Sequence, residues 1–456
     1  MSPSLPMRRD GSSSSGRVLG RRRTILFGAL SFALFLLLGY SAHSMGVLPL
    51  SGIGFESIYT QNAAAPPAGG RASRPLSVRA ARRMQDRLYA KASMHPRPVC
   101  EWTPWHEARY APLRNTKRRI MLPMLLHKSG ALVSTLAQEL PVVLEWLGVE
   151  NVFVSIYESG SPDGTREYLG DFRKILDAVG VKNQIVTYGD TREENTEGNR
   201  RIMVMAAARN TVLTPFYTGQ VATVLGGEPD EVFFLNDIFF CAPDLLEVLL
   251  QYRQQGMHQA CATDWEIGVY DRWVLRAISG KGWWRQDDLL EYFGTPDDHP
   301  KTLPVPLLDE EVDRRRWEKH LPLQVFSCWN GATVINAEAF LPPHNMRFRQ
   351  SKADWEDEEK GIPLNATSKA SECFLSSVDL WKMGFNRIAI IPKASVAYRF
   401  KHYVESRKDS ESFAPKGDDE VFEWIGNWKE TPPKEVISQD YAWWHLPERL
   451  GPWDEQ

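Results

Sequence analysis

The sequence contains few cysteines and no Cys-x-x-Cys pair. Among its 456 residues the cysteines are Cys100, Cys241, Cys261, Cys328 and Cys373. The lack of closely paired cysteines argues against a zinc ribbon or a thioredoxin-type redox site. Five cysteines allow at most two internal bridges and leave one thiol over, so we expect a large domain that does not depend on a disulfide framework.

The sequence also lacks a basic stripe interleaved with aromatic residues, and it lacks internal repeats of the length found in solenoid proteins. The first absence argues against a nucleic-acid partner, and the second argues against a repeat architecture. What is present is an ordinary globular composition, with 43% hydrophobic and 24% charged residues. Such a composition can bury a sizeable core and excludes disorder throughout the chain.

The formal net charge of -3 hides a basic N-terminus. Six arginines and one aspartate lie in residues 1–23, so this tail is positive and the remainder of the chain carries the excess of acidic residues. The uncharged stretch TILFGALSFALFLLLGY follows from Thr24 to Tyr40. It is long enough to cross a bilayer as a helix, and the arginines before it predict a cytosolic tail with the rest of the chain on the other side.

These features predict a single-pass type II membrane protein with a cytosolic tail at 1–23 and an anchor at 24–45. The alternative is a signal peptide cleaved near Ala42-His43-Ser44. Asn365 begins the triplet Asn-Ala-Thr, an acceptor for N-glycosylation that is compatible with a lumenal location.

The rest of the chain divides into three predicted parts. Residues 46–115 are rich in Ala, Pro, Gly, Ser and Arg and show little apolar periodicity, which predicts a flexible stem. Strand and helix signals begin near Lys117 and predict one folded domain at 116–405. A tryptophan-rich extension is expected at 406–456.

Strand patterns alternate with helical patterns in the first half of this domain. The segments IMLPMLL, NVFVSIYES, QIVTYGD and EVFFLND predict strands, and residues 132–147, 166–179, 199–213 and 243–251 predict helices. This alternation predicts an α/β fold with a mainly parallel sheet covered by helices on both faces. Ligands bind such sheets at the carboxyl ends of the strands.

Two polar residues, Asn236 and Asp237, end the apolar strand EVFFL and precede another apolar run, IFF. A hard cation such as Mg²⁺ or Mn²⁺ could be held there by the Asp237 carboxylate, an amide oxygen, water and phosphate oxygens. The alternative is that Asp237 caps the following turn.

A second polar group lies at the end of the strand NVFVSIYES. It consists of Tyr157, Glu158, Ser159 and Asp163. Glu158 and Ser159 could accept hydrogen bonds from a ribose or a base, and the alternative is a strand-to-helix loop that uses these groups for its own hydrogen bonds.

Arg209 shares a helix face with Ile202 and Val212, so we expect it to point toward the core. A buried arginine needs an anion. A diphosphate oxygen would serve, as would a structural carboxylate such as Glu231.

Three further segments offer polar groups to a sugar or a phosphate. Trp329, Asn330 and Gly331 could form a loop that stacks a sugar on the indole and binds its hydroxyls. Glu372 lies in the first turn of a predicted helix with Ser371 as its cap, and capping alone would also explain it. His402, with Arg399 and Lys401, could approach a phosphate, although a lone histidine is more often structural.

Eight ordered segments carry a resemblance to a known family. They are RRIMLPMLLHKSG, NVFVSIYESGSPDGTREYL, the Arg209-Asn210 pair, FLNDIFFCAPDLLEVLL, ACATDWE followed by YDRWVLRAISG, SCWNG, ASECFL and PKASVAY. In order and spacing, from about Arg118 to Phe400, the chain resembles the fungal capsule-associated (cryptococcal) α-1,3-mannosyltransferase family.

The resemblance implies a GT-A-like nucleotide-sugar-binding fold in a type II membrane glycosyltransferase of the Golgi or another secretory-pathway membrane. It implies transfer of mannose from GDP-mannose to the 3-hydroxyl of an α-mannoside with retention. The acceptor would be a mannose-containing glycan of the cell wall, the capsule or another glycan. A divalent cation, Mn²⁺ or Mg²⁺, usually takes part.

The resemblance also suggests roles for single residues. It gives Asn236 and Asp237 the role of the Asp-x-Asp motif of other GT-A enzymes, with Asp237 as the metal ligand, although Leu235 stands where an acid would precede the pair. Glu372 resembles the acidic residue that opens a helix near the acceptor, and His402 resembles a late histidine that contacts phosphate or metal. Asp264 is a further candidate for binding an acceptor hydroxyl.

Two other classes of function stay open. Asp237 and Glu372 could be the two carboxylates of a glycosidase, which would act on an α-mannoside without a nucleotide. The missing acid before Asn236 also leaves room for a catalytically silent carbohydrate-binding or scaffold protein.

Overall fold

The computed structural model describes residues 83–88, 97–187, 199–266, 268–284, 308, 310–351, 370–410, 424–439 and 449–455. All of them belong to the compact unit Arg74–Gln456. The predicted tail at 1–23, the predicted anchor at 24–45, much of the predicted stem and Asn365 lie outside the described residues. None of the described helices combines the length and the apolarity that crossing a bilayer requires.

The centre of the fold is a ten-stranded sheet with the order β3-β2-β1-β4-β9-β5-β10-β8-β7, with β6 paired to β5. The strands are β1 (Ile120–Leu126), β2 (Val152–Glu158), β3 (Lys182–Val186), β4 (Glu231–Leu235), β5 (Gln259–Glu266), β6 (Gly268–Val269), β7 (Arg276–Ala277), β8 (Leu323–Ser327), β9 (Ala332–Asn336) and β10 (Ile388–Val396). The four strands predicted in the first half of the domain are confirmed as β1 to β4.

The prediction of a mainly parallel sheet is wrong for the second half of the domain, because the sheet is mixed. Strands β3, β2, β1 and β4 are parallel, as are β5 and β10. Strand β9 lies antiparallel between β4 and β5, and β8 is antiparallel to both β10 and β7. The regular strand-helix alternation that imposes parallel pairing does not continue after β5, which is followed by β6 and β7 without a described helix between them.

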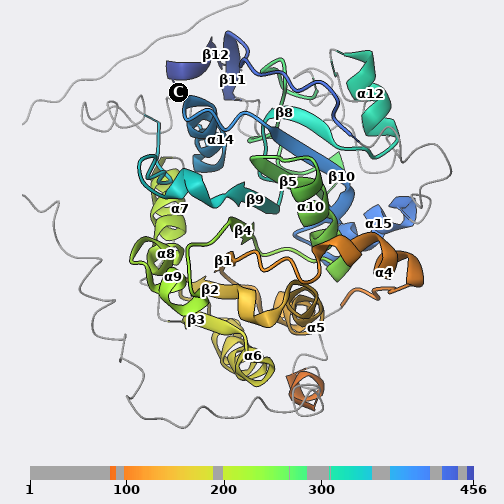
Figure 1. Cartoon of the computed structure of the whole chain (residues 1–456), viewed down its shortest axis with the longest axis vertical. Helices are drawn as coiled ribbons and strands as arrows, with labels where there is room; N and C mark the ends of the chain where they lie inside the picture. Colours follow the sequence, from red (N-terminus) through yellow and green to blue (C-terminus); the bar gives the residue numbers. More distant parts are fainter. Residues whose placement is uncertain are drawn as a thin grey trace, which may run out of the picture. The chain divides into compact units, whose positions relative to one another are not determined.

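Helices cover both faces of the sheet. Those described are α4 (Pro104–Tyr110), α5 (Gly130–Leu147), α6 (Thr165–Val179), α7 (Asn199–Val212), α8 (Thr214–Tyr217), α9 (Gln220–Leu225), α10 (Ala242–Gln254), α12 (Glu311–Glu318), α14 (Glu372–Lys382) and α15 (Phe400–Ser410). One hydrophobic core lies under α5, α6 and α10, and a second lies under α7 and α14. In Figure 1, α7 and α14 accordingly lie on the left of the sheet and α10 and α5 on the right.

The folded region begins earlier than the predicted boundary between stem and domain at residues 115 and 116. Tyr110 and Leu113 are buried, and the Trp146 indole donates a hydrogen bond to the Tyr110 carbonyl oxygen at 2.8 Å. Even Leu88, on a helical segment at 83–88, is buried in the first core. The prediction failed here because single aromatic and apolar anchors, rather than a periodic pattern, hold this segment on the domain.

Two disulfides form, and their pairing could not be predicted from the sequence. Cys100 is bonded to Cys241 at the start of α10, and Cys261 of β5 is bonded to Cys328. Cys373 is the free, buried thiol. The first bridge fixes another part of the predicted stem to the domain.

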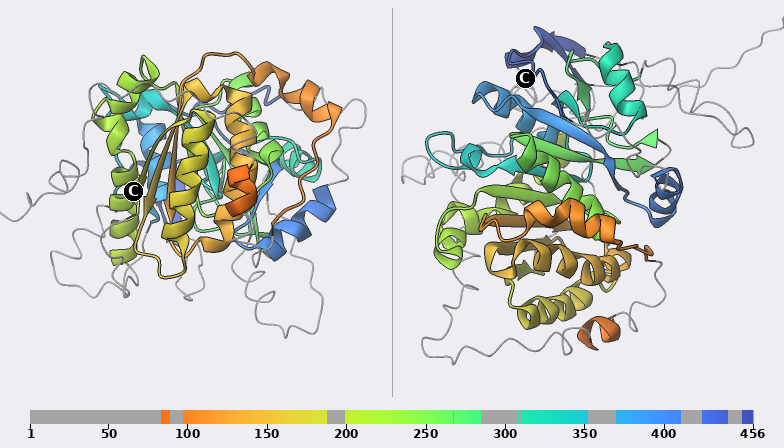
Figure 2. Two further views of the ribbon diagram at one scale, coloured as in Figure 1. Left: turned by 90° about the horizontal axis from the view of Figure 1, so that it is seen from below. Right: turned by 45° about the vertical axis from the view of Figure 1, so that its right-hand side comes forward.

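The predicted boundary at residue 405 is also wrong, because it falls inside α15. The described parts of the C-terminal extension pack on the domain: Val436 of the hairpin β11 (Glu435–Gln439) and β12 (Arg449–Pro452) is fully buried. Figure 2 (right) shows this hairpin, in dark blue, at the end of the sheet where α12 lies. The extension is therefore part of the folded domain.

Candidate functional site

The segment Asn236-Asp237 leaves the sheet at the carboxyl end of β4, as predicted. The parallel register places Met124 beside Leu235 and Leu125 beside Tyr157, so the chain leaves β1, β2 and β4 at the same edge. Both polar groups that the sequence singled out therefore lie at the edge where open α/β sheets bind ligands.

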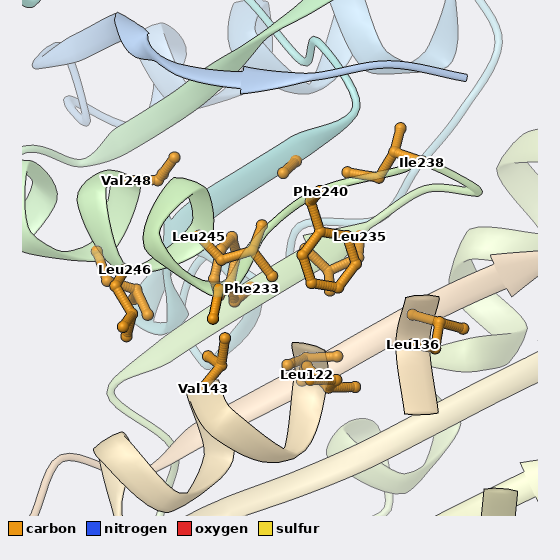
Figure 3. Packing of buried hydrophobic residues seen from close by; sticks show 14 of the residues in the cluster. Leu122, Leu136, Val143, Phe233, Leu235, Ile238, Phe240, Leu245, Leu246 and Val248 are labelled. Carbon is orange, nitrogen blue, oxygen red and sulfur yellow. The ribbon is translucent and has the colours of Figure 1, made fainter. Parts of the chain in front are cut away.

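Apolar side chains before and after this segment hold it in place. Figure 3 shows Phe233, Leu235, Ile238 and Phe240 packed in one core with residues of β1, α5 and α10. All four side chains are fully buried. The chain can therefore place Asn236 and Asp237, each half-buried, in a fixed position between two apolar anchors.

The Asn236 side chain is occupied by protein partners. Its Oδ1 accepts hydrogen bonds from the Trp329 indole at 3.1 Å and from Arg209 Nη1 at 3.4 Å, and its Nδ2 donates to the Tyr398 hydroxyl at 2.7 Å. The amide oxygen that the sequence suggested as a cation ligand is thus used within the protein. Asn236 instead fixes the backbone that carries Asp237.

Arg209 is buried, as predicted from its helix face, but its anion is Glu372 rather than Glu231. Arg209 Nε donates to Glu372 Oε1 at 3.0 Å, and the guanidinium lies 4.3 Å from the centre of the Trp329 ring. Glu231 is taken by Arg253, which binds it through two nitrogens at 2.8 and 2.7 Å. Two residues predicted to contact different substrates, Arg209 and Glu372, are therefore bonded to each other.

Glu372 opens α14, and Ser371 caps this helix by accepting a hydrogen bond from the Cys373 amide at 3.2 Å. This confirms the predicted helix start and its cap. The helix N-terminus and Arg209 both favour a negative charge on Glu372, which explains how a carboxylate can stay buried here.

Asp264 lies at the end of β5 and is fully buried. Its Oδ1 accepts hydrogen bonds from Asn330 Nδ2 at 2.8 Å and from the Asp271 amide at 3.2 Å. Its Oδ2 is buried and has no hydrogen-bond partner. Asp264 is thus held in place within the protein. The sequence had suggested that it binds an acceptor hydroxyl, but its side chain is not exposed to an acceptor.

A second carboxylate, Asp271, lies beside Asp264. The chain turns back after β5 into β6, which pairs with it, and the Tyr270 amide donates to the Asp264 carbonyl oxygen at 2.8 Å. Burial and the adjacent Asp264 raise the pKa of Asp271 to about 8, while burial raises the pKa of Asp264 to about 6. Glu372 also raises the pKa of Asp271, and Arg209 lowers it. Near neutral pH the two aspartates therefore retain a proton that ordinary carboxyl groups would have lost.

The structure gives Trp329, Asn330 and Gly331 a different role from the predicted sugar contact. Trp329 is 1% exposed and lies under Arg209, and Asn330 is fully buried. Asn330 has a positive φ of 47°, and Gly331 has one of 79°. This loop therefore packs against Arg209 and the carboxylate cluster, which consists of Asp264, Asp271 and Glu372. It does not present an open aromatic face to a sugar.

In the loop after β2, the polar groups form hydrogen bonds within the protein, which is the alternative to nucleotide binding that the sequence left open. Glu158 is fully buried and accepts hydrogen bonds from the Ser161 amide and from Arg166 Nε. Asp163 accepts hydrogen bonds from the Gly130 amide at 3.1 Å and from the Thr165 amide at 3.2 Å, at the starts of α5 and α6. The Ser159 carbonyl oxygen is 2.9 Å from His127 Nδ1. These groups build the strand-to-helix connection, while Tyr157 is half-buried at the same edge.

His402 is buried on α15. Its neighbour Tyr403 donates a hydrogen bond to Asp244 of α10 at 2.6 Å, so this part of α15 is packed against the domain. The proposed phosphate contact of His402 stays a prediction.

The donor groups near Asp237 limit how a cation could be held. Within the described part of the chain, one group of three possible metal ligands comes together, and it does not include Asp237: Cys100, Glu139 and Cys241. Its two cysteines form a disulfide, so this group does not hold a metal. Since the Asn236 amide oxygen accepts hydrogen bonds from protein groups, we consider the Asp237 carboxylate as the ligand that the predicted pair could offer. Its hard oxygen atoms fit Mg²⁺ or Mn²⁺ if phosphate oxygens and water supply the other positions.

Sequence reasoning missed Asp271, Tyr398 and Tyr270. Tyr398 receives the Asn236 hydrogen bond, and Tyr270 packs on Tyr398 with ring centres 4.9 Å apart. Asp271 lies in YDRWVLRAISG and Tyr398 lies in PKASVAY, two segments that carried the family resemblance without a role for these residues. A tight return after β5, indicated by Gly268, was the signal that could have placed Asp271 beside Asp264.

The fold and the site together define an α/β protein whose buried carboxylates gather at the carboxyl ends of β4 and β5 and at the start of α14. The family model described as Cryptococcal mannosyltransferase 1 matches residues 119–379. The chain belongs to this cryptococcal mannosyltransferase family. The matched segment contains Arg209, Asp237, Asp264, Asp271 and Glu372.

The chain is also similar to individual proteins. It is 33% identical over 298 residues to an α-1,3-mannosyltransferase of Cryptococcus neoformans var. neoformans, and the match covers 64% of this chain and 60% of that relative. Among solved structures, a mannosyltransferase from Pyrobaculum calidifontis in complex with GDP-Man and Mn²⁺ matches with a TM-score of 0.33 and 10% identity, over 73% of each chain. A glucosyl-3-phosphoglycerate synthase from Mycobacterium tuberculosis matches with a TM-score of 0.28 and 13% identity, over 71% of this chain and 88% of that one.

Proposed function

We propose that the chain is a membrane-anchored glycosyltransferase that transfers mannose from GDP-mannose to the 3-hydroxyl of an α-mannoside, with retention. The observation that carries this proposal is that the family match spans the whole carboxylate cluster from Arg209 to Glu372. The acceptor is a mannose-containing glycan of the cell wall, the capsule or a related polymer. A GT-A-like binding mode places the nucleotide at the carboxyl ends of β1, β2 and β4.

Asp237 is the proposed residue on the diphosphate side of the site. A divalent cation bound to its carboxylate would neutralise charge that develops on the leaving diphosphate. Asn236, Trp329 and Tyr398 hold the segment that carries Asp237 through the hydrogen bonds described above. Because Arg209 is bonded to Glu372 and Asn236, we assign it to organising the cluster and no longer to binding the diphosphate.

The carboxylates supply the charge that such a reaction needs. With one carboxyl group protonated, Glu372, Asp264 and Asp271 carry two negative charges, which face the guanidiniums of Arg209 and Arg272. In this proposal the carboxylates lie nearer to C1 of the sugar than the guanidiniums do. Cleavage of the bond between C1 of mannose and the diphosphate oxygen gives C1 a partial positive charge. A fixed negative field beside C1 stabilises this transition state without reorganisation during the reaction.

The reaction balances without any further reactant. The C1–oxygen bond to the diphosphate breaks, a new bond forms from C1 to the acceptor oxygen, and the proton of the acceptor hydroxyl leaves with the released nucleotide or to solvent. Retention means that the new bond lies on the same face of C1 as the old one.

The proposed location follows from the N-terminal sequence. A cytosolic tail at 1–23 and an anchor at 24–45 would place residues 46–456 in the lumen of the Golgi or another secretory compartment. The two disulfides and the Asn365 triplet are compatible with that compartment.

The donor assignment is tested by thermal unfolding of the purified full-length chain with a panel of nucleotide-sugars, with and without Mn²⁺. A ligand that binds the native state raises the melting temperature. We expect GDP-mannose and GDP to raise it more than UDP-sugars do, and we expect Mn²⁺ to enlarge the difference. A preference for UDP-sugars would overturn the donor assignment while leaving the family assignment intact.

The same preparation separates the two other classes of function. A glycosidase would release mannose from an α-mannoside without a nucleotide, and a silent binding protein would bind mannosides without consuming a donor. The ion pair of Glu372 with Arg209 argues against the glycosidase, because Glu372 is committed to a protein partner.

A further inference from the structure

We propose that Asp271 is the residue that binds the reacting hydroxyl of the acceptor sugar, and that Asp264 and Asn330 are positioning residues that hold Asp271 in place. This inference rests on the proposed function. It replaces the sequence-based candidate Asp264 with a residue that the sequence did not single out.

The turn after β5 brings the two aspartates together. Strand β6 pairs back onto β5 with Trp265 opposite Val269 and Glu266 opposite Gly268. Gly268 has a positive φ of 87°, which suits the tight return. The Asp271 amide then donates to Asp264 Oδ1 at 3.2 Å, so the backbone of Asp271 is fixed by the buried carboxylate.

Asn330 binds both members of the pair. Its side-chain Nδ2 donates to Asp264 Oδ1 at 2.8 Å, and its backbone forms a hydrogen bond with the Asp271 carboxylate. Left-handed backbone at Asn330 and Gly331 turns the amide and the side chain toward the same cluster. The tripeptide that the sequence suggested as the sugar contact is thus the support on which Asp271 lies.

Accessibility decides between the two carboxylates. Asp264 is fully buried, and its Oδ2 is enclosed without a hydrogen-bond partner, so no sugar can reach it in this arrangement. Asp271 as a residue is half-buried, next to Tyr270, which is 41% exposed. Burial is the largest cause of the raised pKa of the Asp271 carboxyl group, so this group also lies below the surface. Of the pair, Asp271 is nevertheless the residue that lies nearer the surface, and we place the acceptor hydroxyl on its side.

Charged groups from four elements surround Asp271. Asp264 of β5 and Glu372 of α14 are negative, Arg209 of α7 is positive, and Arg272 follows in the same loop. Tyr398, after β10, lies in the field of Asp264, Asp271 and Asp237, which connects Asp271 to the proposed diphosphate side. A sugar hydroxyl that donates its hydrogen to Asp271 would thus lie between the negative cluster and the donor.

The test uses the purified full-length chain and the variant Asp271→Asn, which keeps the size of the side chain and replaces its carboxyl group by an amide. Initial rates are measured against acceptor α-mannoside at saturating GDP-mannose, and donor binding is measured separately by the melting-temperature shift. We expect kcat/KM for the acceptor to fall by about thirtyfold or more, since the carboxyl group that accepts the hydrogen bond of the acceptor hydroxyl is lost, and we expect the shift caused by GDP-mannose to stay at the wild-type size. Asp171→Asn on the surface of α6 is the matched control and should behave as wild type.

Asp271→Glu keeps the carboxyl group, and it provides the test if the asparagine variant does not fold. It should recover part of the lost acceptor turnover, whereas a purely structural role for Asp271 would be disrupted by the longer side chain as much as by asparagine. Asp264→Asn should lower acceptor turnover less than Asp271→Asn does. Acceptor kcat/KM within twofold of wild type in Asp271→Asn would overturn the inference while the proposed function survives. A wild-type chain that neither binds GDP-mannose nor transfers mannose would overturn both.

Discussion

Arg209 and Glu372 show how a single ion pair organises the site. The arginine is 3% exposed, binds Glu372 through Nε and Asn236 through Nη1, and rests on the Trp329 ring. Burying either charge alone would cost several kcal/mol, so each residue depends on the other. The pair joins α7, the end of β4 and the start of α14 at one point.

Removing the charge of Glu372 should therefore destabilise the fold. In Glu372→Gln the guanidinium of Arg209 stays buried without a carboxylate, and we expect the free energy of unfolding to fall by about 3 kcal/mol. Denaturant unfolding of the full-length chain measures this loss. The double variant Arg209→Met with Glu372→Leu leaves no unpaired charge and should be less destabilised, although inactive.

The pair Lys174–Asp171 on α6, with side chains 66% and 22% exposed, is the control for this experiment because water reaches both charges. Asp171→Asn should change stability by less than about 1 kcal/mol. A change in Glu372→Gln no larger than that of this surface variant would contradict the organising role of the pair.

The raised pKa values of Asp264 and Asp271 predict how stability depends on pH. The unfolded chain loses these protons near pH 4, whereas the folded protein holds them up to about pH 6 and pH 8. Over this window the folded state binds more protons, so the contribution of the pair to stability is greatest at low pH and is lost as the pH rises to about 8. Burial raises the pKa of Glu139 to about 7, which acts in the same direction.

Melting temperatures of wild type and Asp264→Asn, measured from pH 5 to pH 8, check this sign. The variant should lose less stability across the range than wild type does, and Asp171→Asn should follow wild type. Parallel curves for wild type and Asp264→Asn would contradict the assigned protonation of the pair.

At the residue scale, the sequence could identify the chemistry but not the partners. The burial of Arg209 followed from the apolar residues on its helix face, and the start of α14 followed from Ser371 and Glu372. That Arg209 binds Glu372, which lies 163 positions away, depends on the packing of two helices that no local pattern specifies. The same reason hid Tyr398 and the pairing of Asp271 with Asp264.

Among the elements, the loop between β8 and β9 requires a glycine at one position. Gly331 has a φ of 79°, and a Cβ built on it would lie 2.9 Å from Ile238 Cγ2 and 3.0 Å from Val396 Cγ2. A side chain here would be strained in its backbone and would press on the segment that follows Asp237. The glycine is therefore needed for the position of Asn330 and of both aspartates.

Gly331→Ala should reduce both stability and transfer. We expect a loss of about 3 kcal/mol from backbone strain and steric contact together, with a fall in acceptor turnover because Asn330 shifts. Gly384→Ala is the matched control, since Gly384 has a φ of 86° but a Cβ added to it would meet nothing within 4 Å. That variant should lose only about 1 kcal/mol from backbone strain and keep its activity; equal effects in thermal unfolding would remove the steric part of this explanation.

The elements that the sequence could predict are those with a sustained period. β1 to β4 and the helices between them follow the expected alternation, because each strand is a continuous apolar run and each helix has a buried face. β9 could not be placed in the same way. Its antiparallel position between β4 and β5 depends on the left-handed turn at Asn330 and Gly331 and on long-range pairing, so the sheet is mixed where a parallel one was predicted.

For the whole molecule, segments outside the predicted domain complete it. The Cys100–Cys241 bridge and the Arg109–Glu247 ion pair, with Nε 2.6 Å from Oε2, fasten the segment before β1 to α10. At the other end, the buried Arg276 donates to the Ile437 carbonyl oxygen at 2.5 Å, and the Ile437 amide donates to the Gly280 carbonyl oxygen at 2.9 Å. Composition gave no sign of either attachment, because both rest on a few specific contacts.

The C-terminal hairpin should be required for an intact site. Arg276 also donates to the carbonyl oxygens of Arg272 and Trp273, in the loop that begins with Asp271. Gly280→Ala would place a Cβ 2.5 Å from the Glu435 carbonyl oxygen and should detach the hairpin. We expect faster proteolysis after residue 423 and lower acceptor turnover.

Gly426→Ala serves as the control within the same extension, because nothing lies within 4 Å of a Cβ at that position. It should show wild-type proteolysis and wild-type turnover. Undiminished turnover in Gly280→Ala after complete loss of the hairpin would show that the extension does not support the site.

The central claim is that the carboxylate at the end of β4 serves mannose transfer. The most direct measurement is the rate of mannose transfer from GDP-mannose to an α-mannoside by full-length wild type and Asp237→Asn, with the linkage of the product determined. We predict an α-1,3-linked product from wild type and a rate at least about a hundredfold lower in the variant, with an unchanged melting temperature. Wild-type turnover by Asp237→Asn, or a different sugar or linkage in the wild-type product, would contradict the account.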